Sequence, residues 1–135
     1  ELFAADKEDE WTKKHIRQVS SLPYAWLLPQ CRMMLSHGGA GVIHATLRAG
    51  IPPVIAPLMG DQFSFAKLVQ AKQIGVRVGA SLPAITRDEW KTAIRAAVEC
   101  EDAAKAFGED VKSDPILGVE RMVTALEEKI VGQTQ

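Results

Sequence analysis

Three glycines, Gly38, Gly39 and Gly41, follow directly on His37 and a short apolar run. This cluster limits the possible folds more than any other part of the sequence. A helical pattern follows it at residues 40–49, and a second apolar run comes next. The order places the glycines in the turn between a buried strand and the amino terminus of a helix. Such turns belong to α/β folds, in which parallel strands alternate with helices.

A turn of this kind is a natural site for an anion. The first N–H groups of a helix have no partner within the helix, and the helix dipole is positive at that end. Glycines let a phosphate approach the backbone, and the His37 imidazole adds a donor beside it. Glycines can also serve a tight turn alone, but three within four residues favour a ligand. The spacing is not the G-x-G-x-x-G of dinucleotide-binding proteins.

A polar pair, Asp61 and Gln62, follows the next expected strand at residues 52–57. The carboxyl ends of parallel strands meet at one edge of a sheet, so we expect this pair beside the glycine turn. A carboxylate and an amide suit the hydroxyls of a sugar. Asp61 alone would be interpreted as a simple helix cap. A phosphate site beside a polyol site instead predicts a protein that binds a nucleotide sugar.

Four pieces of the sequence together resemble the donor-binding motif of inverting GT-B-fold glycosyltransferases that use UDP-sugars. The most similar variant is the sterol glucosyltransferase type, with its bacterial antibiotic-modifying relatives. The resemblance covers residues 19–125, and the spacing between the pieces also agrees. Each piece alone would be a weak indication, whereas the combination is specific. The pieces are L-P-Y-A-W-L-L-P at 22–29, H-G-G-A-G at 37–41, L-R-A-G-I-P at 47–52 and G-D-Q at 60–62.

The resemblance implies a role for each piece. The nucleoside would lie near residues 19–23, at Leu22 and Pro23, and the hydroxyls of a glucose-like hexose would bind Asp61 and Gln62. The imidazole of the turn would stabilise the leaving group without abstracting a proton. The donor's diphosphate would be contacted by the residues of the glycine turn: His37, Gly38, Gly39, Ala40 and Gly41.

The sequence departs from the family pattern at Val42, where a Ser or Thr usually donates to a phosphate. We expect the missing hydroxyl to cost about 1 kcal/mol of diphosphate affinity. Trp26 is interpreted as a core aromatic residue behind the site, with stacking on uracil as the alternative. His44 is interpreted as a helix-surface or packing residue. Trp11 and Trp90 are interpreted as structural.

The resemblance also implies that an active enzyme needs more than these 135 residues. GT-B enzymes have two Rossmann-like domains, and the amino-terminal one binds the acceptor and carries the general base. The sequence has no room for that domain and lacks the first strand of the donor domain. We expect UDP-sugar binding without transfer by this chain alone. The alternatives are a donor subunit completed by a separate acceptor-binding chain, and a non-catalytic binding or interaction module.

Composition indicates one globular domain and argues against several other classes. The formal net charge is −1, which gives no reason to expect nucleic acid binding. No apolar run reaches the ~18 residues of a membrane-spanning helix, although the full enzyme could associate peripherally with membranes. Cys31 and Cys100 lack metal-ligand spacing, and we expect neither a metal nor a cofactor. Free thiols fit a reducing compartment, and we expect a cytoplasmic protein.

The expected fold is α/β: a Rossmann-like parallel sheet with flanking helices, forming part or all of the carboxyl-terminal half of a GT-B fold. Its domain organisation is a charged segment at 1–14, a nucleotide-sugar donor-binding domain at 15–131 and a tail at 132–135. The expected strands lie at residues 15–19, 32–36, 52–57 and 76–78. The expected helices lie at residues 24–28, 40–49, 63–73 and 103–112.

Two further helices are predicted by their start signals. Thr86 and Glu89 form a capping box, which opens a helix carrying Trp90 on its apolar stripe. Asp114 and Pro115 would open a terminal helix. The apolar face of that terminal helix would comprise Val119, Met122, Val123, Leu126 and Ile130.

Overall fold

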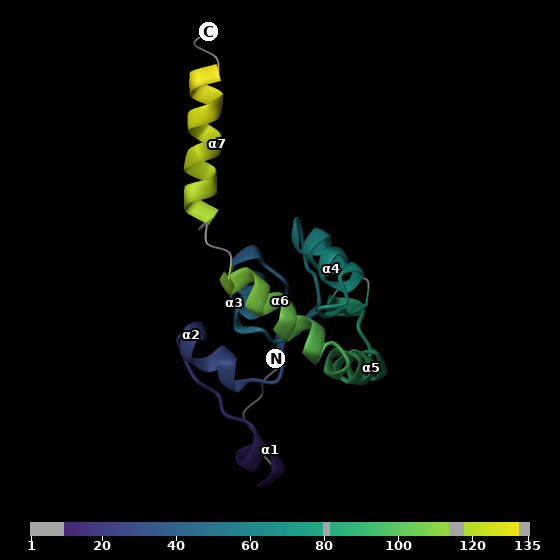
Figure 1. Ribbon diagram of the computed structural model, residues 1–135. Coiled ribbons are helices and arrows are strands. Elements are labelled where there is room, and N and C mark those ends of the chain that lie inside the picture. Colours follow the sequence, from purple (N-terminus) through teal and green to yellow (C-terminus); the bar gives the residue numbers. More distant parts are fainter. Residues whose placement is uncertain (1–9, 80–81, 114–117, 133–135) are drawn as a thin grey trace.

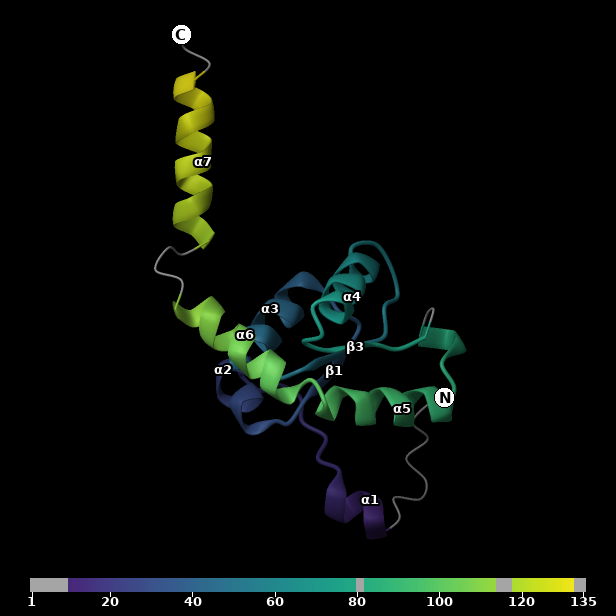
Figure 2. The same cartoon turned by 45° about the vertical axis from the view of Figure 1, so that its right-hand side comes forward.

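Three parallel strands form one sheet in the order β1-β2-β3, with helices on both faces (Figures 1 and 2). The strands are β1 (Met34–Ser36), β2 (Pro53–Ile55) and β3 (Val76–Arg77). This computed structural model describes residues 10–79, 82–113 and 118–132 of the chain. The register pairs Leu35 with Val54, and Val54 with Val76. The predicted parallel α/β fold is therefore confirmed.

The helices divide between the two faces of the sheet. In Figure 2, α3 and α4 lie on one side of the strands and α5 lies on the other, while α6 runs from α5 across α3. The helical elements are α1 (Glu10–His15), α2 (Tyr24–Leu27), η1 (Leu28–Gln30), α3 (Ala40–Ala49), α4 (Gln62–Ala71), η2 (Leu82–Ala84), α5 (Arg87–Val98), α6 (Glu101–Ser113) and α7 (Gly118–Gly132).

The core consists of two clusters that meet at β2. Ile55 packs with residues of α3 and α4, among them Ile43 and Val69. Its neighbour Val54 packs on the opposite face with Ala97 of α5. Both strand residues are 0% exposed. A strand buried on both faces needs apolar residues at successive positions, which explains the unbroken apolar run of β2.

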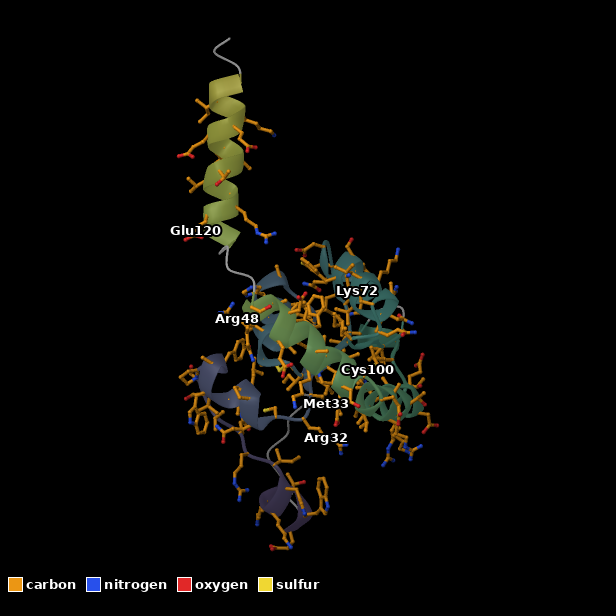
Figure 3. All side chains as sticks on the ribbon, in the orientation of Figure 1. Arg32, Met33, Arg48, Lys72, Cys100 and Glu120 are labelled. Atoms are coloured by element: carbon orange, nitrogen blue, oxygen red, sulfur yellow. The ribbon has the colours of Figure 1, made fainter. Side chains whose placement is uncertain are left out.

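Helix α6 approaches α3 closely because it carries a glycine at the crossing. A Cβ on Gly108 would lie 2.6 Å from the Leu47 carbonyl oxygen and 2.7 Å from the Gly50 Cα atom. The Lys72 ammonium lies 5.9 Å from the Phe107 ring centroid, which links α4 to α6 (Figure 3). An ion pair between Arg32 and Glu101 joins the approach to β1 with the start of α6. These contacts hold α6 against α3.

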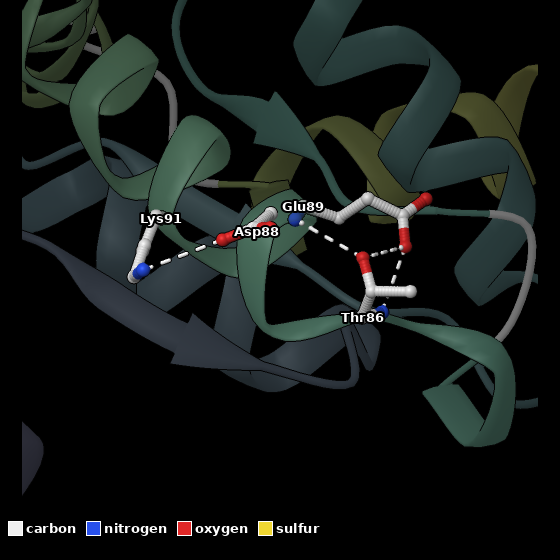
Figure 4. Close-up of polar contacts among 4 residues, drawn as sticks. All are labelled: Thr86, Asp88, Glu89 and Lys91. Carbon is white, nitrogen blue, oxygen red and sulfur yellow. Dashed lines mark hydrogen bonds and ion pairs between the residues drawn. The ribbon is translucent and has the colours of Figure 1, made fainter.

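The predicted capping box at α5 is present (Figure 4). The Thr86 N–H donates to Glu89 Oε2 at 2.7 Å, and the Glu89 N–H donates to Thr86 Oγ1 at 3.3 Å. Trp90 packs against the core on this helix, as predicted. The expected helix signal at Asp114 and Pro115 lies outside the described residues.

The strand predicted at 15–19 is wrong, because helix α1 ends at His15 and residues 16–19 form no strand. Among the described residues, no strand lies beyond β1 to pair with this segment. The helix α1 begins inside the charged segment 1–14, and Trp11 stacks on His15 with ring centroids 4.6 Å apart. A strand cannot form without a neighbour, however well its pattern alternates.

The terminal helix α7 projects away from the rest of the described chain (Figure 1). Its expected apolar face is exposed, with Met122 at 64% and Ile130 at 66%. The side chain of Val119 lies outside the described part. Figure 3 shows Glu120 at the start of this helix. The predicted helix is therefore present, but its described side chains are exposed and do not pack in the core.

Candidate functional site

The turn after β1 runs directly over the end of β2. Gly38 has φ +87°, and a Cβ there would lie 2.4 Å from Ile55 Cγ2, so only glycine fits. Its N–H donates to Ser36 Oγ at 3.2 Å. The Ala56 N–H donates to the Ser36 carbonyl at 3.0 Å. Gly38 is buried, whereas Ala40 and Gly41 after it are exposed.

Helix α3 begins without a side-chain cap. Gly39 is its N-cap residue and supplies no oxygen to the first turn. The N–H groups of Ala40, Gly41 and Val42 therefore have no acceptor within the part of the chain that the structure describes. A Cβ on Gly41 would meet nothing within 4 Å, so neither packing nor backbone strain requires glycine there. An uncapped, open helix terminus of this kind attracts an anion.

The His37 side chain lies against this helix terminus. Its Nε2 atom is 2.8 Å from the position that a Cβ of Gly39 would take. The residue is exposed, and neither ring nitrogen makes a hydrogen bond to another described residue. The glycine at position 39 thus leaves room for the imidazole beside the open N–H groups. The imidazole and the open N–H groups therefore lie at the same end of α3.

The loop after β2 lies at the same edge of the sheet, because Ser36 and Ile55 are opposite each other in the register. Asp61 is the N-cap residue of α4, but its side chain accepts no capping hydrogen bond. The simple helix-cap interpretation of Asp61 is therefore wrong. Its carboxylate is exposed, and in the described regions it has no hydrogen bond or ion pair. The structure thus brings a free acceptor to the edge that carries the His37 turn.

Gln62 has a contact that the sequence did not reveal. Its Oε1 atom accepts from the Leu58 N–H at 2.8 Å and from the Met59 N–H at 3.1 Å. The side chain is half-buried, in contrast to the exposed Asp61 beside it. No local pattern distinguishes a glutamine that bonds backward to a loop from one that faces a ligand.

The residues predicted to hold a nucleoside lie before α2, which packs against α3. Leu22 is half-buried, and its backbone N–H and carbonyl make no hydrogen bond to the described residues. The Pro23 carbonyl accepts from Trp26 and Leu27 in the first turn of α2. Trp26 is 59% exposed, so the core interpretation of this residue is wrong. Trp26 lies on the short helix α2, before the glycine turn, and its side chain is exposed.

The remaining residues singled out from the sequence lie on α3. His44 is exposed, in agreement with a helix-surface role. Val42 is half-buried in the first turn, where its carbonyl accepts from Thr46 Oγ1 at 2.7 Å. Over residues 10–79, 82–113 and 118–132, no cluster of three or more His, Cys, Asp or Glu side chains is arranged to hold a metal. None of the described helices is long and apolar enough to cross a membrane.

The arrangement of strands and helices matches solved GT-B glycosyltransferases. The spinosyn rhamnosyltransferase SpnG superposes with a TM-score of 0.69 at 23% identity, over 82% of this chain and 30% of that protein. The glycosyltransferase VinC, solved in complex with DTDP, superposes with a TM-score of 0.68 at 23% identity, over 83% of this chain and 28% of its own. The fold is therefore that of a carboxyl-terminal GT-B domain.

The sequence comparison identifies the family. Residues 6–124 match the domain described as erythromycin biosynthesis protein CIII-like, C-terminal, and the chain belongs to this family of glycosyltransferase donor-side domains. A sterol 3-beta-glucosyltransferase of Saccharomyces cerevisiae (strain YJM789) is 40% identical over 73 residues, which are 54% of this chain and 6% of that protein.

A second relative, of Cryptococcus neoformans var. neoformans serotype D (strain JEC21 / ATCC MYA-565), is also named sterol 3-beta-glucosyltransferase. It is 32% identical over 111 residues, which are 80% of this chain and 7% of that protein. The resemblance to donor domains of the sterol glucosyltransferase type is therefore confirmed. The chain spans only a small part of the length of these relatives.

Proposed function

We propose that this chain binds UDP-glucose as the donor domain of an inverting glycosyltransferase that glucosylates a sterol or another lipophilic alcohol. The observation that carries the proposal is the uncapped amino terminus of α3, with His37 against it and Gly41 open. A diphosphate fits such a terminus because open N–H groups and the helix dipole favour negative charge. The names of the sterol-specific relatives support the acceptor class, and the DTDP of VinC supports a pyrimidine nucleotide.

The proposed chemistry is the stabilisation of a leaving group. When the bond between the anomeric carbon and the diphosphate oxygen breaks, negative charge develops on the diphosphate. The N–H groups of Ala40 and Gly41 and the imidazole of His37 stabilise that charge. Asp61 accepts a hydrogen bond from a sugar hydroxyl, and the free backbone groups of Leu22 pair with the edge of the base. The acceptor alcohol also needs a general base, which we assign to an amino-terminal domain or a partner chain.

Calorimetric titration of UDP and UDP-glucose into the chain tests this proposal. We expect binding by the wild type and an affinity about 10- to 150-fold lower in His37→Ala, since a hydrogen bond to a charged group contributes ~1.5–3 kcal/mol. His44→Ala is the matched control, because His44 is an exposed histidine on the helix that follows the turn. Equal affinities of wild type and His37→Ala would contradict the proposed site. A parallel titration of dTDP compares the affinity for a thymine nucleotide with that for a uracil nucleotide.

The titration and a transfer assay test two further parts of the proposal. We propose that binding needs no metal, so EDTA and Mg²⁺ should leave the affinity unchanged. We also propose that the isolated chain transfers no glucose from UDP-glucose to a sterol, because donor and acceptor must be positioned together. Transfer by the chain alone would contradict this, whereas transfer after adding a separate acceptor-binding chain would favour a two-subunit enzyme.

Val42 favours a second candidate, a non-catalytic binding or interaction module. This residue replaces the usual hydroxyl donor in the first turn of α3. A domain that no longer carries out transfer has less need of a tight diphosphate site. The absence of UDP and UDP-glucose binding by the wild type would support this candidate over the transferase.

A further inference from the structure

Asp61 and Gln62 are adjacent, but their surroundings differ. Gln62 is half-buried, and its Oε1 atom accepts two backbone hydrogen bonds, from Leu58 at 2.8 Å and from Met59 at 3.1 Å. The Asp61 side chain is exposed and unbonded within the described part of the chain. Two residues that serve one ligand in the same way would both direct their polar atoms outward. Within the described residues, both carboxylate oxygens of Asp61 lack a partner, whereas the Gln62 oxygen is bonded to the loop.

The two backbone donors also fix which way the Gln62 amide points. An N–H group needs an acceptor, and in a glutamine side chain that acceptor is the carbonyl oxygen. The Nε2 atom therefore makes no bond to these two N–H groups. It keeps its hydrogens for a partner outside and can act there only as a donor.

The loop that Gln62 contacts has little else to hold it. Leu58 is 48% exposed and Met59 is 70% exposed, so neither side chain anchors the loop by burial. Gly60 has φ +58° and open space around its missing side chain. The Gln62 N–H donates to the Met59 carbonyl at 3.3 Å, and the Asp61 carbonyl accepts from two N–H groups in the first turn of α4 at 2.9 and 3.0 Å. Within the described residues, the bonds to Oε1 are the hydrogen bonds that the Leu58 and Met59 N–H groups make.

We infer that Gln62 is a positioning residue, which fixes the loop from Leu58 to Asp61 and thereby sets where the Asp61 carboxylate meets a sugar hydroxyl. Gln62 contributes to the sugar itself only a donor, through Nε2. The identity of the ligand in this inference rests on the proposed function. The bonds between Gln62 and the loop do not, and they can be tested without a ligand.

The first test uses the ligand-free chain and three variants. Gln62→Ala removes the acceptor, Gln62→Glu keeps an oxygen for both N–H groups but removes the amide donor, and Gln70→Ala is an exposed glutamine control on the same helix. Amide hydrogen exchange at Leu58 and Met59 is followed by NMR, with the Asp61 amide shift as a local marker. We expect exchange to accelerate about tenfold in Gln62→Ala only, since an unbonded exposed amide loses its protection. Unchanged exchange in Gln62→Ala would overturn the inference.

The second test compares affinities for UDP-glucose and UDP, so that the glucose contribution is isolated as a ratio. We expect Asp61→Ala and Gln62→Ala each to lower this affinity ratio to near one. The double variant should lower the ratio no further than either single variant, because one residue acts through the other. Gln62→Glu should keep most of the ratio. Additive losses, or a ratio lost as fully in Gln62→Glu as in Gln62→Ala, would make Gln62 a direct ligand and overturn the inference. If the wild type binds both ligands equally, the proposed sugar site fails, and the exchange data alone decide the role of Gln62.

Discussion

Gly38 and Gly41 lie three positions apart, yet the backbone requires glycine only at the first. Gly38→Ala would combine a φ of +87° with a Cβ 2.4 Å from Ile55 Cγ2. We expect this variant to lower the free energy of unfolding by about 2–4 kcal/mol, measured by urea denaturation. A loss below about 0.5 kcal/mol would mean that the turn relaxes easily.

Gly41→Ala is the matched variant and should behave in the opposite way. A Cβ there meets nothing within 4 Å, and Gly41 lies in the first turn of α3. We expect the free energy of unfolding to rise by about 0.5–1 kcal/mol, because alanine loses less conformational freedom in a helix. We also expect UDP to bind less tightly, since the added methyl stands where the diphosphate approaches. Unchanged UDP affinity would contradict the proposed approach of the ligand to this position.

Val42→Thr tests whether the missing hydroxyl can be restored. Threonine matches valine in shape, and Val42 is half-buried in the first turn of α3, so the helix should accept it. We expect an affinity for UDP about fivefold higher, the usual effect of one added hydrogen bond of ~1 kcal/mol. Calorimetry measures this, with Val42→Ala as the control for loss of the side chain alone. A Val42→Thr variant that binds no tighter would mean that the hydroxyl does not reach the diphosphate.

At the level of single elements, the start of α5 offers a prediction that depends on pH. The Thr86 N–H, and then the Thr86 hydroxyl, donate to Glu89 and lower the pKa of its carboxyl below the usual 4.5. A lowered folded-state pKa gives stability that is present above the unfolded value and lost as pH falls through the folded value. We expect Glu89→Ala to be less stable than the wild type at pH 7, with the difference shrinking as pH falls below 4.5.

Two further variants control this experiment. Glu89→Gln keeps an uncharged acceptor, so its stability relative to the wild type should improve as the pH falls. Thr86→Ala removes the cap itself and should cost about 1 kcal/mol at pH 7. Urea denaturation at several pH values measures all of them. A Glu89→Ala difference that stays constant down to pH 3 would contradict the role of the charged carboxylate.

Elements defined by local signals could be predicted from the sequence, and those defined by distant partners could not. The helix at 40–49 is correct to the residue, because Gly50 with φ +77° ends it and the glycine turn begins it. The strand at 15–19 failed because a strand depends on a neighbour that the sequence does not show. The end of α4 was also misplaced. Gln73 takes the positive φ after this helix, while Gly75 is required by the Pro53 carbonyl, 2.4 Å from where its Cβ would lie.

The same distinction applies to the candidate site. The order of strands and turns was enough to place His37 and Asp61 at one edge of the sheet. That order does not predict the direction of a side chain, because the direction depends on contacts made in three dimensions. The sequence predicts Trp26 in the core, but its side chain is exposed. The hydrogen bonds from the loop to Gln62 have no signal in the sequence. Their placement required the structure.

On the scale of the whole molecule, large apolar side chains remain exposed on several elements. Leu35 of the edge strand β1 is 44% exposed, although a strand in a parallel sheet is normally buried on both faces. Trp26 and the apolar face of α7 are exposed as well. This surface agrees with a chain that spans 28–30% of the solved structures it resembles. Exposed apolar patches of this kind promote association between molecules.

Removal of α7 tests where that association arises. The described side chains of this helix are exposed, so a chain ending after Ser113 loses little buried surface. We expect its Tm to change by less than about 3 °C, since a shift of that size corresponds to under ~1 kcal/mol in a small domain. Sedimentation should show less self-association than in the full chain. Met122→Lys with Leu126→Lys in the full chain should reduce association to a similar degree, because charge on the apolar face opposes burial. If the shortened chain instead loses its cooperative unfolding, α7 packs against the core in solution, and its apolar face stabilises the rest of the domain.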